Sequence, residues 1–211
     1  MFDDPSFRPD MLKIYPTLVV KGTRLHEMWE SGDYRPYTTA EAVDVIARMK
    51  AVVPPYVRIQ RIQRDIPVPL IEAGVDKGHL RELVKERMQR DGTPCRCIRC
   101  HEVGLMGIDD YRAEDARPSE IAYEASGGRE HFLAISLPEH DALIGYVRLR
   151  TGDGPVASIR ELKVFGRIVP LDQEGEGWQH RGFGRELVSR AEERAREQGC
   201  STIRVTSGVG V

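Results

Sequence analysis

The feature that most constrains the fold is a glycine-rich turn that leads directly into a helix. The turn reads Gln179–Gly184 and has the pattern Q-x-x-G-x-G. Apolar residues then recur every four positions, which predicts an amphipathic helix with one buried face. These residues are Phe183, Leu187, Ala191 and Ala195. Gly199 marks the end of the helix. Because an apolar stretch at 159–171 precedes the turn and a strand-like stretch at 202–206 follows, the predicted order is strand, turn, helix, strand.

This turn has the chemistry of an anion-binding site. The first N–H groups of a helix lack partners and carry a partial positive charge. Gly182 and Gly184 permit close approach of a phosphate, and Gln179 and Arg181 can add donors. The alternative is an ordinary glycine-containing loop, since short glycine motifs are common. The spacing fits neither a P-loop nor a dinucleotide-binding pattern.

Composition describes a soluble globular protein with no membrane partner. The 211 residues include 31 basic and 33 acidic ones, a balance that neither supports nor excludes a nucleic-acid partner. No apolar run reaches the length of about 18 residues that a membrane helix needs. Three of the four cysteines crowd together, which favours a metal site in a reducing, cytoplasmic setting over a disulfide framework.

Those three cysteines, Cys95, Cys97 and Cys100, have the pattern C-x-C-x-x-C. Three thiolates so close together can surround one soft cation, and Zn²⁺ in a structural role is the natural candidate. The fourth ligand stays open between the adjacent His101, a water and a residue elsewhere. Cysteines without metal are the alternative. An iron–sulfur cluster is disfavoured because the spacing differs from C-x-x-x-C-x-x-C.

The N-terminal part predicts a parallel βαβ unit. An apolar strand at 11–20 is followed by a polar, irregular segment. Thr38 and Glu41 then form a capping box that opens a helix ending near residue 52, and a strand follows at 56–63. Strand, helix and strand in this order pair in parallel.

A row of arginines on the second of these strands is a candidate RNA-binding surface. Strand alternation predicts Arg58 and Arg64 on one face and Arg61 on the other. Arginine is the better phosphate binder, and substrates meet β/α barrels at the C-terminal ends of strands. Lys77, at the start of a charged helix predicted at 76–88, can add to this surface. The alternative is a solvated surface of paired charges.

From about residue 112 the pattern changes to an antiparallel meander. Turn residues separate the strands, and Ser126 to Gly128 form the first turn. The expected strands are 121–125, 131–137, 143–149 and 159–171. Such a meander leads into the glycine-rich turn and its helix.

The glycine-rich turn after a long strand resembles the acetyl-CoA site of the GNAT N-acetyltransferases. The match sharpens with the residues around it, which closely resemble the catalytic subunit of Elongator and its stand-alone bacterial and archaeal relatives. The matching segments are 158–166, Val169 with Pro170, 178–184 and 207–210. The resemblance covers essentially all 211 residues.

This resemblance implies an α/β fold in three parts. Residues 1–93 would be the C-terminal part of a radical SAM β/α barrel, 94–111 a zinc-binding loop, and 112–211 an incomplete GNAT domain. The chain would be a fragment, inactive alone, of an enzyme that carboxymethylates C5 of the tRNA wobble uridine. The full-length enzyme would use acetyl-CoA, S-adenosylmethionine and a 4Fe–4S cluster. Its partners would be tRNA and an Elongator-like assembly or a second copy.

The resemblance also implies the residues of the acetyl-CoA site. Glu161 and His180 are the catalytic candidates, although Glu161 can instead be a structural carboxylate paired with Arg160 or Arg148. The residues that would line the cofactor are Glu161, Leu162, Lys163, Val164, Trp178, Gln179, His180, Arg181, Gly182, Phe183 and Gly184. Two other functions stay open, namely a lysine or histone N-acetyltransferase and a non-catalytic zinc-containing tRNA-binding module.

Overall fold

The structure is a computed structural model that describes residues 1–63, 66–108, 112–166 and 182–206. It divides into two compact units. One unit is formed by residues 10–97, and the other by residues 1–9 together with residue 98 onward. Each is described by itself. Among the described residues, no helix combines the length and the apolar character needed to cross a membrane.

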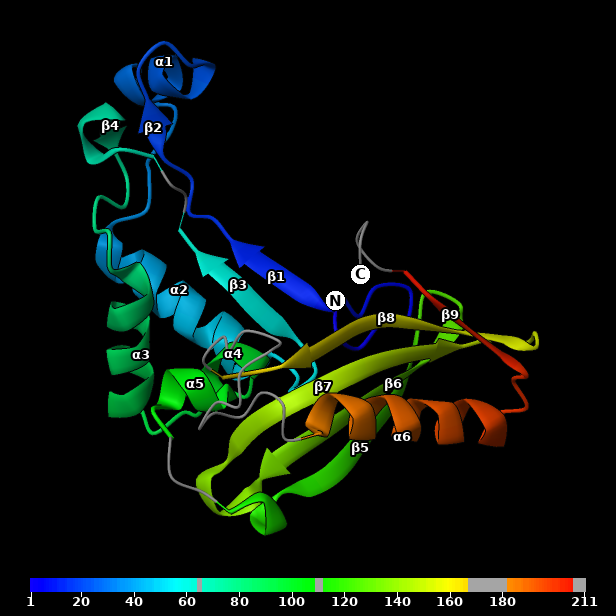
Figure 1. Cartoon of the computed structure of the whole chain (residues 1–211). Coiled ribbons are helices and arrows are strands. Elements are labelled where there is room, and N and C mark those ends of the chain that lie inside the picture. The colour runs from blue at the N-terminus through cyan, green and yellow to red at the C-terminus, as the bar shows by residue number, and fades with distance from the viewer. Residues whose placement is uncertain (64–65, 109–111, 167–181, 207–211) are drawn as a thin grey trace. The chain divides into compact units, whose positions relative to one another are not determined.

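The unit of residues 10–97 contains the predicted parallel strand pair (Figure 1). β1 and β3 run parallel, and α2 lies between them in sequence, as predicted for a βαβ unit. The elements are β1 Met11–Ile14, β2 Val19–Val20, α1 Arg24–Glu30, α2 Thr39–Ala51, β3 Arg58–Ile62, η1 Val68–Leu70, β4 Ile71–Ala73 and α3 Leu80–Arg90. The capping box of α2 is formed as predicted, with Thr38 accepting from the N–H of Glu41 and the Glu41 carboxylate accepting from the N–H of Thr38.

Two predictions for this unit are wrong. The strand expected at 11–20 is divided into β1 and β2, and β2 pairs antiparallel with β4 instead of extending β1. Pro16 lies between them, and proline has no N–H for a strand ladder. The polar segment expected to be irregular contains α1, whose N-cap Thr23 accepts from the N–H of His26. α1 has no buried residue, so the periodic apolar signal is missing.

A β-bulge in β3 overturns the predicted facing of the arginines. Met11 pairs with Arg58 and Lys13 pairs with Arg61, so two residues of β3, Ile59 and Gln60, lie opposite the single residue Leu12 of β1. Cross-strand partners share a face, and the bulge therefore puts Arg58 and Arg61 on the same side of the sheet. Ile59 and Ile62 are buried on the other side.

Arg81 of α3 holds this bulge from outside the strand. Its Nη2 donates to the carbonyl oxygens of Ile59 and Gln60, at 3.2 and 3.3 Å. α3 itself begins at Leu80, four residues later than predicted, and buries Leu80, Val84 and Met88 along one stripe. α3 therefore both packs through this apolar stripe and hydrogen-bonds to the irregular point of β3.

The second unit is built on a five-stranded sheet of described strands in the order β5-β6-β7-β8-β9 (Figure 1). β5 to β8 form the predicted antiparallel meander, and β9 joins β8 in parallel. The elements are α4 Ile98–His101, α5 Val103–Met106, η2 Ala113–Asp115, β5 Arg117–Ala125, β6 Gly128–Leu137, η3 Pro138–His140, β7 Ala142–Thr151, β8 Val156–Val164, α6 Phe183–Glu197 and β9 Thr202–Val205. β8 ends at Val164 within the described residues, and the stretch 167–171 of the predicted strand lies outside them.

The helix predicted from the four-residue apolar repeat is α6, and it packs on one face of this sheet. All four residues of the repeat are buried and belong to the core of the unit. Gly145 of β7 leaves room for both neighbours, because a Cβ there would lie 2.6 Å from the Lys163 carbonyl oxygen of β8 and 3.3 Å from Leu187 Cδ1 of α6. Gly199 follows the helix with a φ of +78°, as its predicted role as the helix stop requires.

Candidate functional site

The central element of the candidate site is the second half of β8, which has a strand partner on one edge only among the described residues. The parallel pairing of β8 with β9 runs from Val156 opposite Thr202 to Ile159 opposite Val205. Within the described residues, β8 beyond this point pairs with β7 alone, through Glu161 to Val164. No described strand pairs with the other edge of this segment, and an edge of this kind is where an extended ligand can add to a sheet as a strand would.

The start of α6 lies beside the end of β8. A Cβ on Gly184 would lie 3.8 Å from Val164 Cγ2. Gly182 is the N-cap with a φ of +85°, and its carbonyl accepts from the N–H of Glu186 at 2.9 Å. Phe183 is buried in the core, so only its backbone can serve a ligand. The first N–H groups of this 15-residue helix point toward a region suited to an anion.

Glu161 is held by cations on both of its oxygens. Arg148 Nε lies 3.1 Å from Oε2, and Lys163 Nζ lies 3.0 Å from Oε1. The Arg148 guanidinium is buried and lies 5.2 and 5.1 Å from the ring centroids of Phe132 and Tyr146. This arrangement matches the alternative in which Glu161 is a structural carboxylate paired with Arg148.

These contacts set the protonation of two groups on this face. Burial raises the pKa of Glu161, but hydrogen bonds from Lys163, Tyr146 and Arg148 together outweigh it and hold the pKa below the ordinary value. Burial, and then the Glu161 charge, raise the pKa of Tyr146. The Tyr146 hydroxyl is near enough to Glu161 to affect its pKa, yet it has no well-aligned hydrogen bond to a described residue. Glu161 is therefore ionised at neutral pH, and the Tyr146 hydroxyl beside it is neutral.

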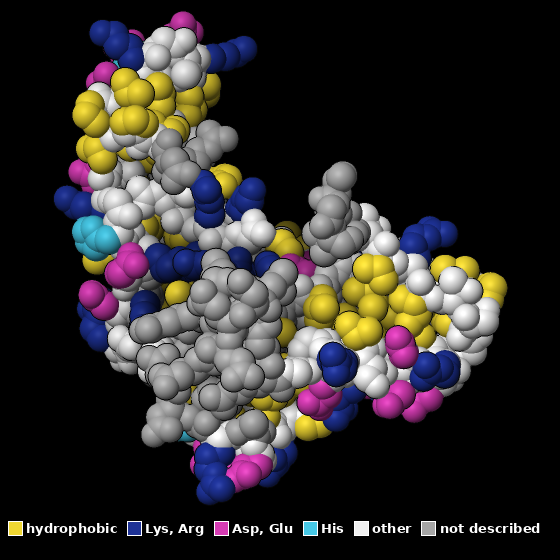
Figure 2. Space-filling model, viewed as in Figure 1, with side chains coloured by type: hydrophobic (Ala, Val, Ile, Leu, Met, Phe, Trp, Pro, Cys, Tyr) yellow, Lys and Arg dark blue, Asp and Glu magenta, His cyan; other side chains and the backbone are white. Residues whose placement is uncertain are grey.

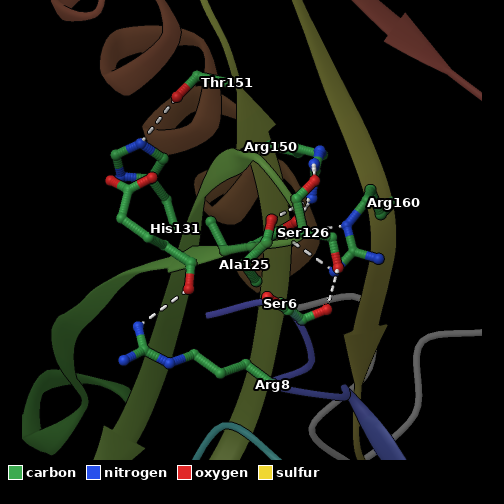
Figure 3. Close-up of polar contacts among 10 residues, drawn as sticks. Ser6, Arg8, Ala125, Ser126, His131, Arg150, Thr151 and Arg160 are labelled. Carbon is green, nitrogen blue, oxygen red and sulfur yellow. Dashed lines mark hydrogen bonds and ion pairs between the residues drawn. The ribbon is translucent and has the colours of Figure 1, made fainter. Parts of the chain in front are cut away.

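A second ion network, which sequence reasoning missed, reaches β8 from two strands away. Glu130 of β6 is buried and accepts from Arg150 of β7 at 2.7 Å and from Arg160 of β8 at 3.0 Å. Figure 3 shows Arg150 and Arg160 side by side. Its members are charged residues on three different strands, and no local pattern signals such a pairing.

Arg150 also fixes the turn between β5 and β6. It donates to the carbonyl oxygens of Ala125 and Ser126, at 3.0 and 2.8 Å (Figure 3). The N-terminal segment meets the same turn, because the N–H of Ser126 donates to the Pro5 carbonyl and Arg8 donates to the Glu124 carbonyl. The turn residues Ser126 and Gly127 were predicted correctly, whereas these contacts were not.

The three cysteines of the predicted metal loop lie together. Their sulfur atoms are all within 4.8 Å of one another, and none of the three is in a disulfide. Thiolates bound to one tetrahedral Zn²⁺ at about 2.3 Å lie roughly 3.8 Å apart, so a shift of about 1 Å or less would bring the three sulfur atoms to the geometry of a shared cation. The neighbouring His101 contacts the Asp141 carbonyl through Nδ1 at 2.7 Å. The cluster can bind a metal with little rearrangement.

The predicted RNA-binding residues are partly described. Arg58 and Arg61 share a face, as the bulge requires, and in Figure 2 Lys and Arg side chains gather where β1 and β3 lie. Lys77 is exposed, with its Nζ 3.9 Å from Asp76. Arg64 lies outside the described residues, as do four predicted residues of the cofactor site. These four are Trp178, Gln179, His180 and Arg181.

Comparison with known families decides the class of the second unit. Residues 90–209 match the acetyltransferase (GNAT) family. The chain belongs to this family. Residues 9–90 match the Radical SAM C-terminal domain. The predicted combination of a barrel segment and a GNAT domain in an α/β chain is therefore confirmed.

The similarity of this GNAT chain to known proteins extends along its whole length. "Elongator complex protein 3" of Danio rerio is 45% identical over 99% of the chain and 40% of its own length. "tRNA uridine(34) acetyltransferase" of Methanocaldococcus jannaschii is 43% identical over 100% of the chain and 42% of its own length. The solved structure of the archaeal Elp3 from Methanocaldococcus infernus superposes with a TM-score of 0.90 at 44% identity, covering 100% of this chain and 53% of that one. The resemblance to the Elongator catalytic subunit is confirmed, and the chain spans about 40% of the length of these curated relatives.

Proposed function

We propose that this chain carries the acetyl-CoA site of an acyltransferase that carboxymethylates C5 of the wobble uridine of tRNA. The observation that carries the proposal is the similarity, along the whole chain, to a relative named as a tRNA uridine(34) acetyltransferase. The edge of β8 that has no described strand partner and the adjoining helix start supply a fitting site within the described residues. A plain lysine or histone acetyltransferase would not explain the barrel segment at 9–90.

In the proposed site the pantetheine arm of acetyl-CoA lies along Glu161, Leu162, Lys163 and Val164 and bonds to their backbone. The pyrophosphate lies at the start of α6, against the N–H groups of Gly182, Phe183 and Gly184. Four residues outside the described ranges would complete the lining, namely Trp178, Gln179, His180 and Arg181. Gln179 and Arg181 add donors to the phosphates.

Glu161 and His180 are the proposed acid–base candidates. The paired Glu161 carboxylate is a weak base, because its two cations stabilise the ionised form and lower its pKa. Its stronger contribution is structural, because its ion pairs fix the positions of the Arg148 and Lys163 side chains beside β8. Proton transfer then falls to His180, whose unperturbed pKa lies near neutral pH.

For the cysteine loop we propose Zn²⁺ held by Cys95, Cys97 and Cys100. The bound ion would cross-link the loop and keep the three thiolates deprotonated, which is a structural role. The proximity of the three sulfur atoms supports it. The match to the Radical SAM C-terminal domain supports S-adenosylmethionine and a 4Fe–4S cluster as further cofactors of the proposed enzyme.

The proposed tRNA surface includes Arg58, Arg61, Arg64 and Lys77. The shared face of Arg58 and Arg61 supports it, since two guanidinium groups three residues apart can reach neighbouring phosphates. The setting would be cytoplasmic, in an Elongator-like assembly or a homodimer.

Calorimetric titration of the chain with a non-hydrolysable acetyl-CoA analogue, with and without total tRNA, tests the proposal. We expect saturable binding that Gly184→Trp abolishes, because the indole would fill the space between α6 and β8. Gly152→Trp is the matched control, since a Cβ at Gly152 meets nothing within 4 Å. tRNA binding without any affinity for the analogue would instead favour the non-catalytic zinc-containing module. For the whole enzyme, modified uridine in tRNA rather than acetylated peptide is the expected product.

A further inference from the structure

β8 contains a bulge at the point where the candidate cofactor site begins. Arg148 pairs with Glu161 and Leu149 pairs with Ile159, so Arg160 is the extra residue of β8. Ile159 is also the last residue of β8 that pairs with β9 in the described ranges. Because a bulge bends its strand and increases the local twist, the bulge at Arg160 turns β8 at the point where its described pairing with β9 ends.

A buried carboxylate two strands away holds the side chain of this bulge residue. Arg160 Nε and Nη2 lie 3.1 and 3.0 Å from Oε2 of Glu130. Only 2% of the Glu130 side chain is exposed, whereas 32% of the Arg160 side chain is. A buried carboxylate that loses a cationic partner is strongly penalised. Glu130 therefore restrains the position of Arg160, and with it the backbone of the bulge.

The other side of Glu130 is anchored rigidly. Its Oε1 accepts from Arg150, which is also its cross-strand partner on β7. Arg150 in turn donates to the two turn carbonyls described above (Figure 3). A Cβ on Gly128 would come within 2.6 Å of this guanidinium, so the turn and Arg150 are closely packed. Glu130 thus links a fixed turn to the bulge of β8.

We propose that Glu130 is a positioning residue for acetyl-CoA binding. Through Arg160 it fixes the bulge in β8, and so sets the direction of β8 where the pantetheine arm would pair with it. The inference rests on the proposed function, because it assigns the arm to this edge. Neither Glu130 nor Arg160 contacts the cofactor in this scheme.

The test compares Glu130→Gln and Arg160→Met with the unmodified chain. Glutamine keeps the size of the Glu130 side chain but has no negative charge, so it cannot form ion pairs with the Arg150 and Arg160 guanidinium groups. We expect roughly tenfold weaker binding of the acetyl-CoA analogue in each variant, the contribution of about one backbone hydrogen bond along the displaced strand. The double variant should bind as weakly as either single one, because both changes release the same bulge.

Hydrogen exchange gives a second measurement that needs no ligand. Backbone amides at 160–164 should exchange faster in Glu130→Gln, while those of α6 keep their relative protection. Glu120→Gln is the control for a general loss of stability, because Glu120 also bonds two side chains, His131 and Arg194, away from β8. It should destabilise the fold and leave the affinity within about twofold.

Three results would overturn the inference. If the unmodified chain binds the analogue and Glu130→Gln binds it equally well, the positioning role of Glu130 is refuted while the proposed cofactor site stands. If Glu120→Gln loses as much affinity as Glu130→Gln, the weaker binding follows from a general loss of stability and not from the bulge. Failure of the unmodified chain to bind would refute the proposed cofactor site together with this role, whereas altered exchange at 160–164 would then show only a structural restraint.

Discussion

Replacing Arg148 by methionine should destabilise the fold through Glu161. Arg148 is 2% exposed, and its guanidinium lies beside two aromatic rings while it holds one oxygen of Glu161. Methionine fills much of the same volume without the charge. Among the described residues, Lys163 would then remain as the cationic partner of Glu161, whose carboxylate side chain is 15% exposed.

The expected loss follows from these contacts. Removing one member of a buried ion pair costs about 3 to 5 kcal/mol. Lys163 still compensates part of the charge of Glu161, which places the loss near the lower end. The lost contacts with the rings of Phe132 and Tyr146 add about 1 kcal/mol. We therefore expect a decrease of about 3 to 4 kcal/mol in the free energy of unfolding.

Urea denaturation at neutral pH measures this loss, and Arg129→Met is the matched control. Arg129 lies 3.8 Å from Glu124, and both side chains are more than half exposed. An exposed pair of this kind contributes about 0 to 1 kcal/mol. A loss in Arg148→Met that is no larger than in Arg129→Met would refute the reasoning, because burial would then not control the strength of the interaction.

The same variant has a pH signature. The pKa of Glu161 is lower in the folded chain than its ordinary value of 4.5. A lowered carboxyl pKa adds stability above the unfolded pKa, and this stability is lost as the pH falls through the folded pKa. The unmodified chain should therefore lose this contribution as the pH drops below about 4.5. Because Arg148→Met weakens the stabilisation of the ionised form, its unfolding free energy should fall less over that range. An equal fall in both proteins would contradict the assigned cause.

Three further predictions concern the core, the metal loop and the bulge of β3. Leu187→Ala should lower the free energy of unfolding by about 2 to 5 kcal/mol, measured by urea denaturation, because the side chain is fully buried in the α6 core. We expect elemental analysis to find zinc in the unmodified chain and in Cys200→Ser, and to find none in Cys100→Ser. Arg81→Met removes the hydrogen bonds that hold the β3 bulge, so Arg58 and Arg61 should no longer share a face. The slope of log K for tRNA binding against log salt concentration should then fall in magnitude by about one. Deletion of Gln60 removes the bulge and leaves Arg58 and Arg61 on one face of a regular strand. In that background Arg81→Met should leave the salt dependence of tRNA binding unchanged. An equal decrease in slope with and without Gln60 would show instead that Arg81 contacts RNA directly.

Local patterns were sufficient where a segment decides its own structure. The four-residue apolar repeat gave α6 because one face of that helix is buried along its whole length. Ser126 and Gly127 gave the hairpin because they have φ values of +48° and +72°, the left-handed backbone that tight turns need. The capping box of Thr38 gave the start of α2 in the same way.

Sequence patterns failed where the partner strand decides. An extra residue in β3 or β8 is visible only once the register with β1 or β7 is known. Strict alternation therefore assigned Arg61 to the wrong face. α1 was missed for a related reason, because a helix that buries no side chain has no apolar period to detect. The ion pairs of Glu130 are separated by 20 and 30 residues, beyond the reach of any local motif.

The two bulges give the candidate surfaces a common physical basis. In β3 an inserted residue brings Arg58 and Arg61 to one face, and Arg81 secures it through backbone carbonyls. In β8 the inserted Arg160 marks the end of the described pairing with β9, and Glu130 secures it through the side chain. A regular strand could give neither result, since it alternates its side chains strictly and favours continued pairing with its neighbour. A bulge without a restraint can shift toward regular pairing. Each bulge is therefore held by a charged side chain of another element, Arg81 of α3 for β3 and Glu130 of β6 for β8.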